Sequence, residues 1–145
     1  MANTGLKTYS ADEVIVVYGN TLVNEGLADG TFVSVEWDED AFSLSIGADG
    51  EGTRSKTNNR GATITLTLMQ TSDINDLLST QYLLDLNTPG GVTSPFLVKD
   101  SNGRTLMAAE ECWIQRAANV EYGREAGERE WVLRTSSLVP FIGGN

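Results

Sequence analysis

Carboxylates supply most of the reactive side chains in this sequence of 145 residues. Glu110 and Glu111 are adjacent, and Asp38-Glu39-Asp40 places three acids in a row. Paired carboxylates can act as acid and base in hydrolysis, but neighbours on a strand point to opposite faces, which makes a shared substrate hard to place. The acidic triplet and Asp49-Gly50-Glu51 lack the ligand spacing of a calcium loop. We therefore predict no metal site.

The sequence contains no histidine and one cysteine, Cys112. Histidine is the commonest general base and metal ligand, and its absence removes Ser-His-Asp and Cys-His arrangements. A single cysteine cannot form an internal disulfide, and its neighbours Trp113 and Ile114 indicate a small core residue rather than a nucleophile. We predict that the chain is not an enzyme, with no catalytic residues and no cofactor.

Three segments alternate between apolar and polar residues, which is the period-two pattern of half-buried strands. They are residues 31–38, 42–46 and 62–68. In the first, Trp37 falls on the same face as Val33 and Val35, which favours burial of Trp37 in the core over exposure as a sugar-stacking platform. We expect the three segments to share one sheet, and Asp38-Glu39-Asp40 to be the tight connection between the first two.

Residues 47–61 separate the second and third of these segments and contain no apolar side chain larger than alanine. The composition predicts a long structureless loop. In a compact domain, such a loop is usually functional or disordered.

The periodicity changes after Gln70. Residues 71–78 combine a hydroxyl for the N-cap with acids in the first turn, and Ile74, Leu77, Leu78 and Tyr82 recur at helical spacing. We predict one α-helix at about residues 72–86, ended by Thr88-Pro89-Gly90-Gly91. Further strands are predicted around 96–99, 104–108, 111–116 and 130–135. The expected fold is mainly β, a sandwich or barrel in a single domain 1–145 with one flanking helix.

The net charge of −10 is unevenly distributed. Residues 1–51 hold ten acids against Lys7 alone, whereas residues 52–145 hold ten acids against nine basic residues. An acidic surface of this kind repels nucleic acid. The longest aliphatic run, Val14–Val17, is too short to span a bilayer, and we expect a chain that is soluble in the cytosol where it is made.

Charges of both signs surround two glycines in residues 121–130. Exposed ion pairs are individually worth ~0–1 kcal/mol, so this loop suits the registration of neighbouring subunits better than the stabilisation of one domain. Assembly into a ring would also cover the exposed sheet edges of a small β domain. The candidate inter-subunit residues are Glu121, Arg124, Glu125, Glu128 and Arg129.

Nearly the whole chain resembles the tail tube proteins of contractile-tailed bacteriophages. The segments that carry the resemblance are 7–14, 29–32, 36–44, 47–60, 85–91 and 121–131, among them Glu36-Trp37-Asp38-Glu39-Asp40, Asp85-Leu86-Asn87-Thr88-Pro89-Gly90-Gly91 and Glu121-Tyr122-Gly123-Arg124-Glu125-Ala126-Gly127. The family has no catalytic motif, so the resemblance rests on the length of the match.

The resemblance implies a barrel-like subunit that assembles into six-membered rings, which stack as the inner tube of the tail. Strands from all subunits would line the channel for ejected DNA, and a contracting sheath would surround the tube. The implied partners are other copies of the chain, the sheath protein, baseplate and terminator proteins at the ends, and the tape measure protein and then DNA in the lumen without specific binding, with no membrane. The implied location is the virion, after assembly in the host bacterial cytoplasm.

Two sets of residues acquire a role through this resemblance. Residues 47–61 would form an inter-ring loop whose contacts are Asp49, Glu51, Arg54, Lys56 and Arg60, the three cations meeting acidic surface on the next ring. Polar faces of the predicted strands would line the lumen. A ring of six chains would carry roughly −60 in total, and the carboxylates that face the lumen would repel DNA. The lumen candidates are Ser34, Glu36, Asp38, Ser43, Ser45, Thr63, Thr65 and Thr67.

Two alternatives fit the same sequence features. The chain could form the tube of a contractile toxin-delivery device, in which the passenger is protein rather than DNA. It could also be a carbohydrate-binding β-sandwich that uses Trp37, Trp113 or Trp131 as a stacking platform. A hydrolase built on Glu110 and Glu111 is the least favoured.

Overall fold

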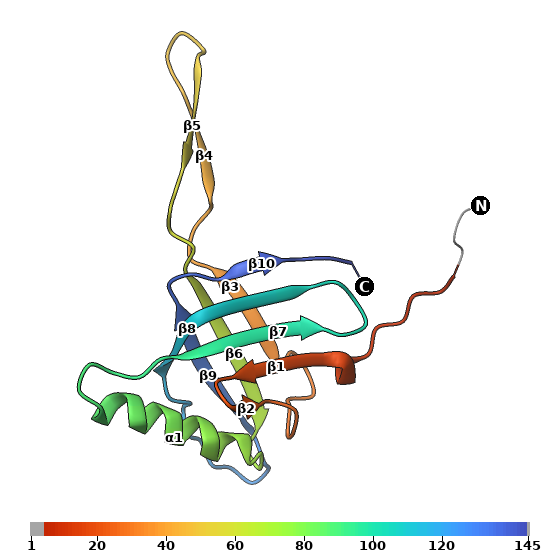
Figure 1. Cartoon of the computed structure of the whole chain (residues 1–145). Helices are drawn as coiled ribbons and strands as arrows, with labels where there is room; N and C mark the ends of the chain where they lie inside the picture. Colours follow the sequence, from red (N-terminus) through yellow and green to blue (C-terminus); the bar gives the residue numbers. More distant parts are fainter. Residues whose placement is uncertain (1–4, 145) are drawn as a thin grey trace.

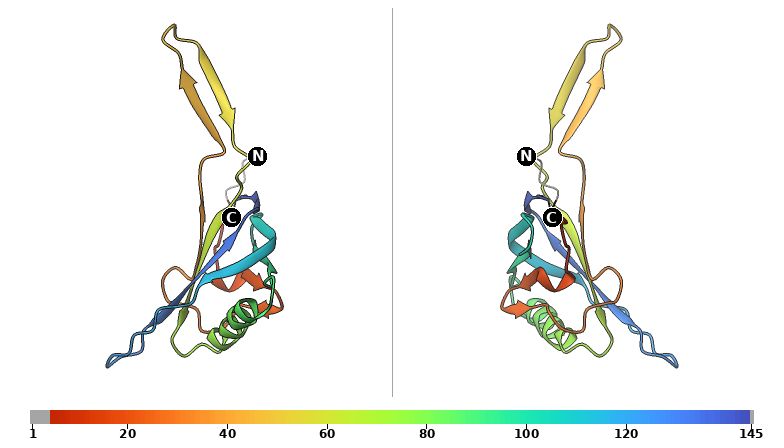
Figure 2. Two further views of the ribbon diagram at one scale, coloured as in Figure 1. Left: turned by 90° about the vertical axis from the view of Figure 1, so that its left-hand side faces the viewer. Right: turned by 90° about the vertical axis from the view of Figure 1, so that its right-hand side faces the viewer.

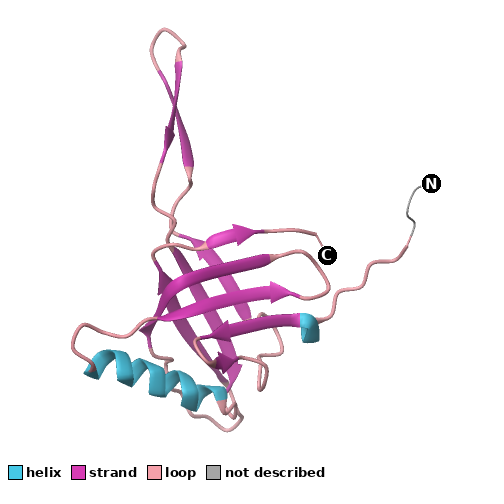
Figure 3. Cartoon of the chain, in the orientation of Figure 1, coloured by secondary structure: helices cyan, strands magenta, loops and turns pink. Residues whose placement is uncertain are grey.

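Strands dominate the computed structural model, which describes residues 5–144; residues 1–4 and 145 of the predicted domain lie outside the described residues. One α-helix and one short 3-10 helix accompany them (Figures 1 and 3). The elements are η1 (Ala11–Glu13), β1 (Val14–Tyr18), β2 (Thr21–Leu22), β3 (Val33–Trp37), β4 (Phe42–Ile46), β5 (Gly52–Lys56), β6 (Ala62–Met69), α1 (Ile74–Asn87), β7 (Ser94–Asp100), β8 (Leu106–Arg116), β9 (Glu128–Thr135) and β10 (Val139–Phe141). The predicted mainly β fold with one α-helix is confirmed.

Eight of the strands form one antiparallel sheet in the order β2-β1-β7-β8-β9-β6-β3, with β10 also paired to β8. The long strand β8 belongs to two layers, because its residues 106–112 pair with β7 and residues 112–116 pair with β9. In Figure 1, β1 and β7 cross over β9, β6 and β3. The two layers enclose one core, in which Val16 and Phe96 of one layer join Ile64 and Leu133 of the other.

β6 and β9 are the central strands of their layer, and buried and less buried residues alternate strictly along both. In β6, Ala62, Ile64, Leu66 and Leu68 are fully buried, and the threonines between them lie on the opposite face. In β9, the buried side chains include Trp131, which is 4% exposed. Trp37 is 37% exposed and lies outside the core, so the predicted burial of Trp37 in the core is wrong. The reason is its position at the end of β3, where the chain leaves the sandwich.

The predicted helix is present as α1 and lies over the core. The prediction of a hydroxyl at the N-cap is wrong, because the N-cap residue is Asp73 and its side chain makes no capping hydrogen bond. The Ser72 hydroxyl, one position earlier, accepts a hydrogen bond from the Ile74 N–H at 3.3 Å. Trp131 Nε1 donates to Asn75 Oδ1 at 2.9 Å and so links β9 to the helix. Ile74 and Leu78 are buried. Leu77, which the pattern placed on the same face, is exposed, as are Leu83, Leu84 and Leu86.

The prediction that residues 42–46 share the sheet with the other two alternating segments is wrong. β3 pairs with β6, whereas β4 pairs with β5 in a separate two-stranded sheet that projects from the sandwich (Figure 1). The acidic triplet therefore connects two strands that do not pair. Likewise, the predicted loop 47–61 is not structureless throughout, because residues 52–56 form β5. The tip is closed by Gly50, whose φ of +87° favours glycine.

Candidate assembly surfaces

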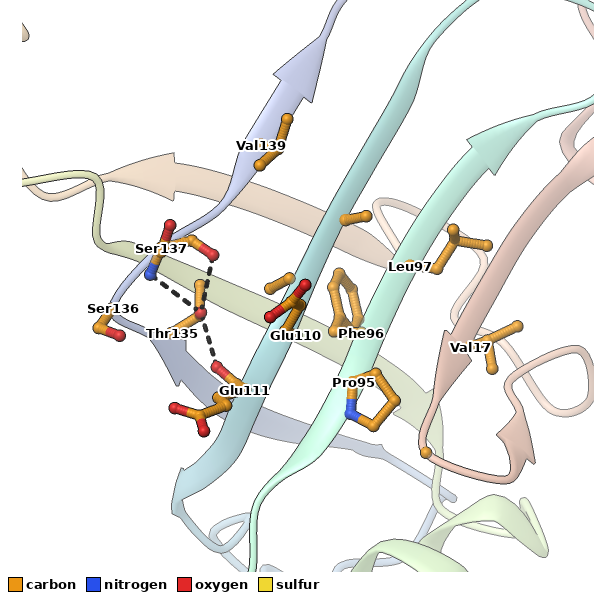
Figure 4. A pocket seen from close by; sticks show the side chains of 13 residues that line it. Val17, Pro95, Phe96, Leu97, Glu110, Glu111, Thr135, Ser136, Ser137 and Val139 are labelled. Carbon is orange, nitrogen blue, oxygen red and sulfur yellow. Dashed lines mark hydrogen bonds between the residues drawn. The ribbon is translucent and has the colours of Figure 1, made fainter.

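Glu110 and Glu111 border the same groove, of about 720 Å³, on the surface formed by β7, β8 and β10 (Figure 4). Their expected separation on opposite faces is wrong because β8 has a bulge at this point. Phe96 pairs with Ala109 and Ser94 pairs with Cys112, so two acids oppose one residue of β7. Apolar side chains including Phe96 and Val139 form the walls. Among residues 5–144, no cluster of three potential metal ligands is present.

A polar face covers the layer formed by β3, β6, β9 and residues 112–116 of β8. Ser34 pairs with Thr65, and Glu36 pairs with Thr63, so these four predicted lumen residues lie side by side. Thr67 continues the row along β6. Ser34 and Glu36 are exposed and the three threonines are half-buried. Five of the eight lumen candidates therefore share one continuous surface.

Asp38 joins the same surface through an ion pair that the sequence did not indicate. Arg134 Nη2 of β9 lies 2.5 Å from Asp38 Oδ2. The Thr63 hydroxyl lies 3.5 Å from the other carboxylate oxygen, and Arg134 Nη1 donates to Gln115 Oε1 at 3.4 Å. Glu130 also lies on this face, opposite Thr67. The face therefore carries Glu36, Asp38, Glu128 and Glu130 against the guanidiniums of Arg116 and Arg134.

The four-stranded layer ends in an unpaired strand edge on each side. Among the described residues, no strand pairs with the outer edge of β3. On the other side, β7 covers β8 only as far as Cys112, so the β7-side edge of residues 113–116 has no strand partner in the described part of the chain. Open edges of this kind are sites for pairing with another chain.

The β4–β5 hairpin has two chemically different faces. One face carries the hydroxyls of Ser43, Ser45, Thr53 and Ser55, because Ser43 pairs with Ser55 and Ser45 pairs with Thr53. The other face carries Phe42, Leu44 and Ile46 with Arg54 and Lys56 opposite them. The Arg54 guanidinium lies 3.9 Å from the centre of the Phe42 ring. The remaining lumen candidates, Ser43 and Ser45, thus lie on the hairpin and not on the sheet.

The predicted inter-ring residues are distributed along this hairpin, and all five are exposed. Asp49 and Glu51 occupy the tip, where Asp49 Oδ1 accepts the Glu51 N–H at 3.1 Å. Arg54 and Lys56 lie on β5. Arg60 lies at the base, where its carbonyl oxygen accepts the Leu138 N–H. The five side chains therefore span the whole projection.

The model of the bacteriophage PhiTE tail tube protein family matches residues 6–143, which is nearly all of the chain. The chain belongs to this tail tube family. It is also 30% identical to structural protein ORF10 of Pseudomonas phage KPP10 over 145 residues, covering 95% of this chain and 83% of that protein. The tail tube protein is accordingly a structural protein of the phage tail and not an enzyme. This membership leaves the carbohydrate-binding alternative without support.

Solved structures with the same fold come from contractile injection systems. The tail tube protein matches the tube-terminating cap of the anti-feeding prophage with a TM-score of 0.60 at 10% identity, covering 97% of this chain and 95% of that chain. It matches a chain of the PVC sheath-tube complex with a TM-score of 0.57 at 9% identity, covering 92% and 91%. Among residues 5–144, no helix is long and apolar enough to cross a membrane.

The charged loop of the tail tube protein projects at the end opposite the hairpin (light blue, Figure 2). Glu121, Arg124, Glu125 and Glu128 are exposed, which suits the inter-subunit contacts predicted for them. Arg129 is different, because it is only 7% exposed and its guanidinium lies 5.4 Å from the centre of the Tyr122 ring. Arg129 therefore packs within its own subunit.

Sequence reasoning missed Arg134 and Glu130 of the tail tube protein, although a signal for them existed. In residues 130–135, Trp131 and Leu133 alternate with Glu130, Val132 and Arg134, and the second set lies on the polar face. The period of two in this strand was sufficient to group these residues. The sequence does not show that β9 pairs with β6, and this pairing places Glu130 and Arg134 beside the threonines of β6.

Proposed function

We propose that six copies of this tail tube protein form a ring and that the rings stack into the inner tube of the tail. The observation that carries the proposal is the four-stranded layer with an open edge on each side. The β3 edge of one copy can pair with residues 113–116 of β8 in the next, and a closed repetition of this contact leaves no free edge. The number six is the one that the family resemblance implies.

The polar face of that layer would line the channel. Its surface residues would be Ser34, Glu36, Asp38, Thr63, Thr65 and Thr67, together with Glu130 and Arg134. The charges of Asp38 and Arg134 cancel, and Glu36, Glu128 and Glu130 outnumber Arg116, so the face keeps an excess of negative charge. Carboxylates repel the DNA backbone, while hydroxyls hold a hydration layer, and the channel would then conduct DNA without binding it.

The hairpin would reach the next ring along the axis. Its contacts there would come from Asp49, Glu51, Arg54, Lys56 and Arg60, and its hydroxyl face would extend the channel lining through Ser43 and Ser45. The charged loop at the opposite end would register neighbouring subunits through Glu121, Arg124, Glu125 and Glu128. These two projections lie at opposite ends of the molecule, as axial stacking requires (Figure 2).

The partners of the assembled tube would be those of a contractile tail. The sheath would surround it, terminator and baseplate proteins would close its ends, and the tape measure protein and then DNA would occupy the lumen. The shared fold with a chain of a sheath-tube complex supports this arrangement. Assembly would take place in the host cytoplasm before the tail joins the virion.

A charge reversal in the lumen tests the conduit. Glu36→Lys should leave tube assembly intact and slow DNA ejection, because a cationic ring attracts the phosphate backbone. Asp76→Lys is the matched control, since Asp76 is exposed on α1, away from the polar face, and the change in charge is equal. Ejection is measured by dye binding to DNA released from purified particles. Equal ejection rates in the two variants would contradict a lumen position for Glu36.

A further inference from the structure

The apolar face of the β4–β5 hairpin has no cover within its own subunit. Phe42, Leu44 and Ile46 remain 47%, 68% and 66% exposed. An isolated two-stranded hairpin is marginally stable in water. This hairpin carries three large apolar side chains on one side and so requires a surface that buries them in the assembled state.

A groove of suitable chemistry lies at the opposite end of the same subunit. It has a volume of about 1320 Å³ and is bordered by apolar residues that include Leu27, Phe32 and Met69. The acids along it are Asp12, Asp29 and Glu128, and all three are exposed. Lys7 is the only basic residue in the first 51 residues and is not among those that border the groove. The groove is therefore apolar with an acidic rim.

We propose that this groove receives the apolar face of the hairpin from a second copy of the chain in the adjacent ring. The proposal rests on the stacking proposed above and names the surface that accepts the hairpin. Leu44 pairs with Arg54 and Phe42 pairs with Lys56, so the hairpin face that is apolar is also basic. Apolar side chains would meet the groove floor, while the two cations would meet the acids at its rim.

The positions of the two surfaces permit a continuous stack. β3 runs from Val33, beside the groove, to Trp37, beside the hairpin, and β6 runs back from Ala62 to Met69. Each strand of the hairpin has five residues, a length of about 17 Å. Because the contact joins one end of a subunit to the other end of the next, it is heterologous and propagates along one axis.

Insertion of the apolar face of the hairpin into the groove leaves its hydroxyl face uncovered. The hydroxyls of Ser43, Ser45, Thr53 and Ser55 would then be the part of the hairpin that is exposed in the tube. Helix α1 presents the other candidate surface through Leu77, Leu83, Leu84 and Leu86. Acids alone do not decide between the two surfaces, because α1 carries Asp76 and Asp85. The groove is favoured because it is hollow and adjoins the end of the polar face at Met69 and Glu128, so that an inserted hairpin can keep its hydroxyl face in line with that face.

Charge exchange between the two surfaces tests the pairing. Arg54→Glu with Lys56→Glu should raise the protein concentration needed for tube formation by about tenfold or more, because like charges then face each other. Asp12→Lys with Asp29→Lys should do the same, and the four changes together should restore assembly. Lys99→Glu with Arg104→Glu is the matched control for the first pair, because both residues are exposed and lie outside the hairpin, the groove and the proposed ring contact. Restoration in the fourfold variant supports the groove, and failure of restoration in folded protein overturns it.

A disulfide crosslinking test locates the contact directly and does not depend on the protein concentration needed for tube formation. The Leu44→Cys variant is mixed under oxidising conditions with a Phe32→Cys variant, and separately with a Leu84→Cys variant. We expect crosslinked dimers only with the groove cysteine, since a disulfide needs Cα atoms within about 7 Å. Crosslinking to Leu84→Cys instead would overturn the groove proposal while leaving the tube intact. If the unaltered protein forms no tubes, the stacking proposal fails first.

Discussion

At the scale of single residues, Cys112 is the clearest case of a side chain whose reactivity is determined by its surroundings. It is fully buried, and burial raises the pKa of its thiol from 9.0 to about 12. At pH 8.5, this difference makes the reactive thiolate about a thousandfold rarer than in an exposed cysteine. The core position that the sequence predicted for Cys112 is confirmed.

We therefore expect Cys112 to resist iodoacetamide in the folded protein at pH 8.5 and to react fully in guanidinium chloride. Mass spectrometry measures the fraction alkylated. Because the raised pKa favours the protonated thiol of the folded state, the thiol also contributes stability that is lost as the pH rises from about 9 to 12. Rapid alkylation of the folded protein, at the rate of an exposed Leu22→Cys variant, would contradict this account.

Arg134 shows what the residue pattern leaves out. Alternation alone could group it with Glu130 and Val132 on the polar side of a strand. Its partner Asp38 is 96 positions away in the sequence, and the two meet because β3 and β9 both pair with β6. The pairing depends on sheet order, which a single sequence does not specify. The lumen candidates from β3 and β6 needed only the alternation.

At the scale of elements, the outer edge of β3 is the feature on which the proposed ring closure depends. The N–H of Thr67 bonds to the Phe32 carbonyl and the N–H of Asp38 bonds to the Gly61 carbonyl. In an antiparallel ladder, the even-numbered residues between them bond to β6, and the odd-numbered residues point their N–H groups outward. The N–H of Val35 is therefore available to a neighbouring subunit.

Val35→Pro should leave the subunit folded and prevent ring formation, because it removes an outward N–H and keeps the ladder to β6. Ser34→Pro is the contrasting control, since it removes an N–H that bonds to β6 within the subunit, and it should lower the free energy of unfolding by about 1–3 kcal/mol. Circular dichroism in urea measures the folding, and light scattering measures the assembly. Normal rings from Val35→Pro would exclude β3 from the interface.

In the hairpin, the sequence pattern predicted strand β4 but did not predict its partner β5. Residues 42–46 carry an apolar alternation that indicates a strand by itself. Residues 52–56 carry none, and they become β5 because backbone hydrogen bonds to β4 do not depend on apolar side chains. Any prediction based on the pattern of hydrophobic residues would assign such a polar segment to a loop. Its cations lie on the same face as the apolar residues of β4, which only the register reveals.

At the scale of the whole molecule, the fold class was predictable and the division into surfaces was not. Alternating segments and one helical segment were enough to predict a mainly β domain. The separation of β4–β5 from the sandwich, and the passage of β8 between two layers, arise from pairings between distant segments. These two features determine where the hairpin, the polar face and the acidic groove lie relative to one another, and the proposed tube rests on that arrangement.

We propose that this chain closes into rings that stack through opposite ends of each subunit. Negative-stain electron microscopy of the purified protein across a concentration series, with mass determined by light scattering, tests it most directly. We expect hexameric rings at low concentration and stacked tubes with an open channel at higher concentration. A monodisperse monomer at every concentration, including in the presence of preformed tail-tube ends, would contradict it.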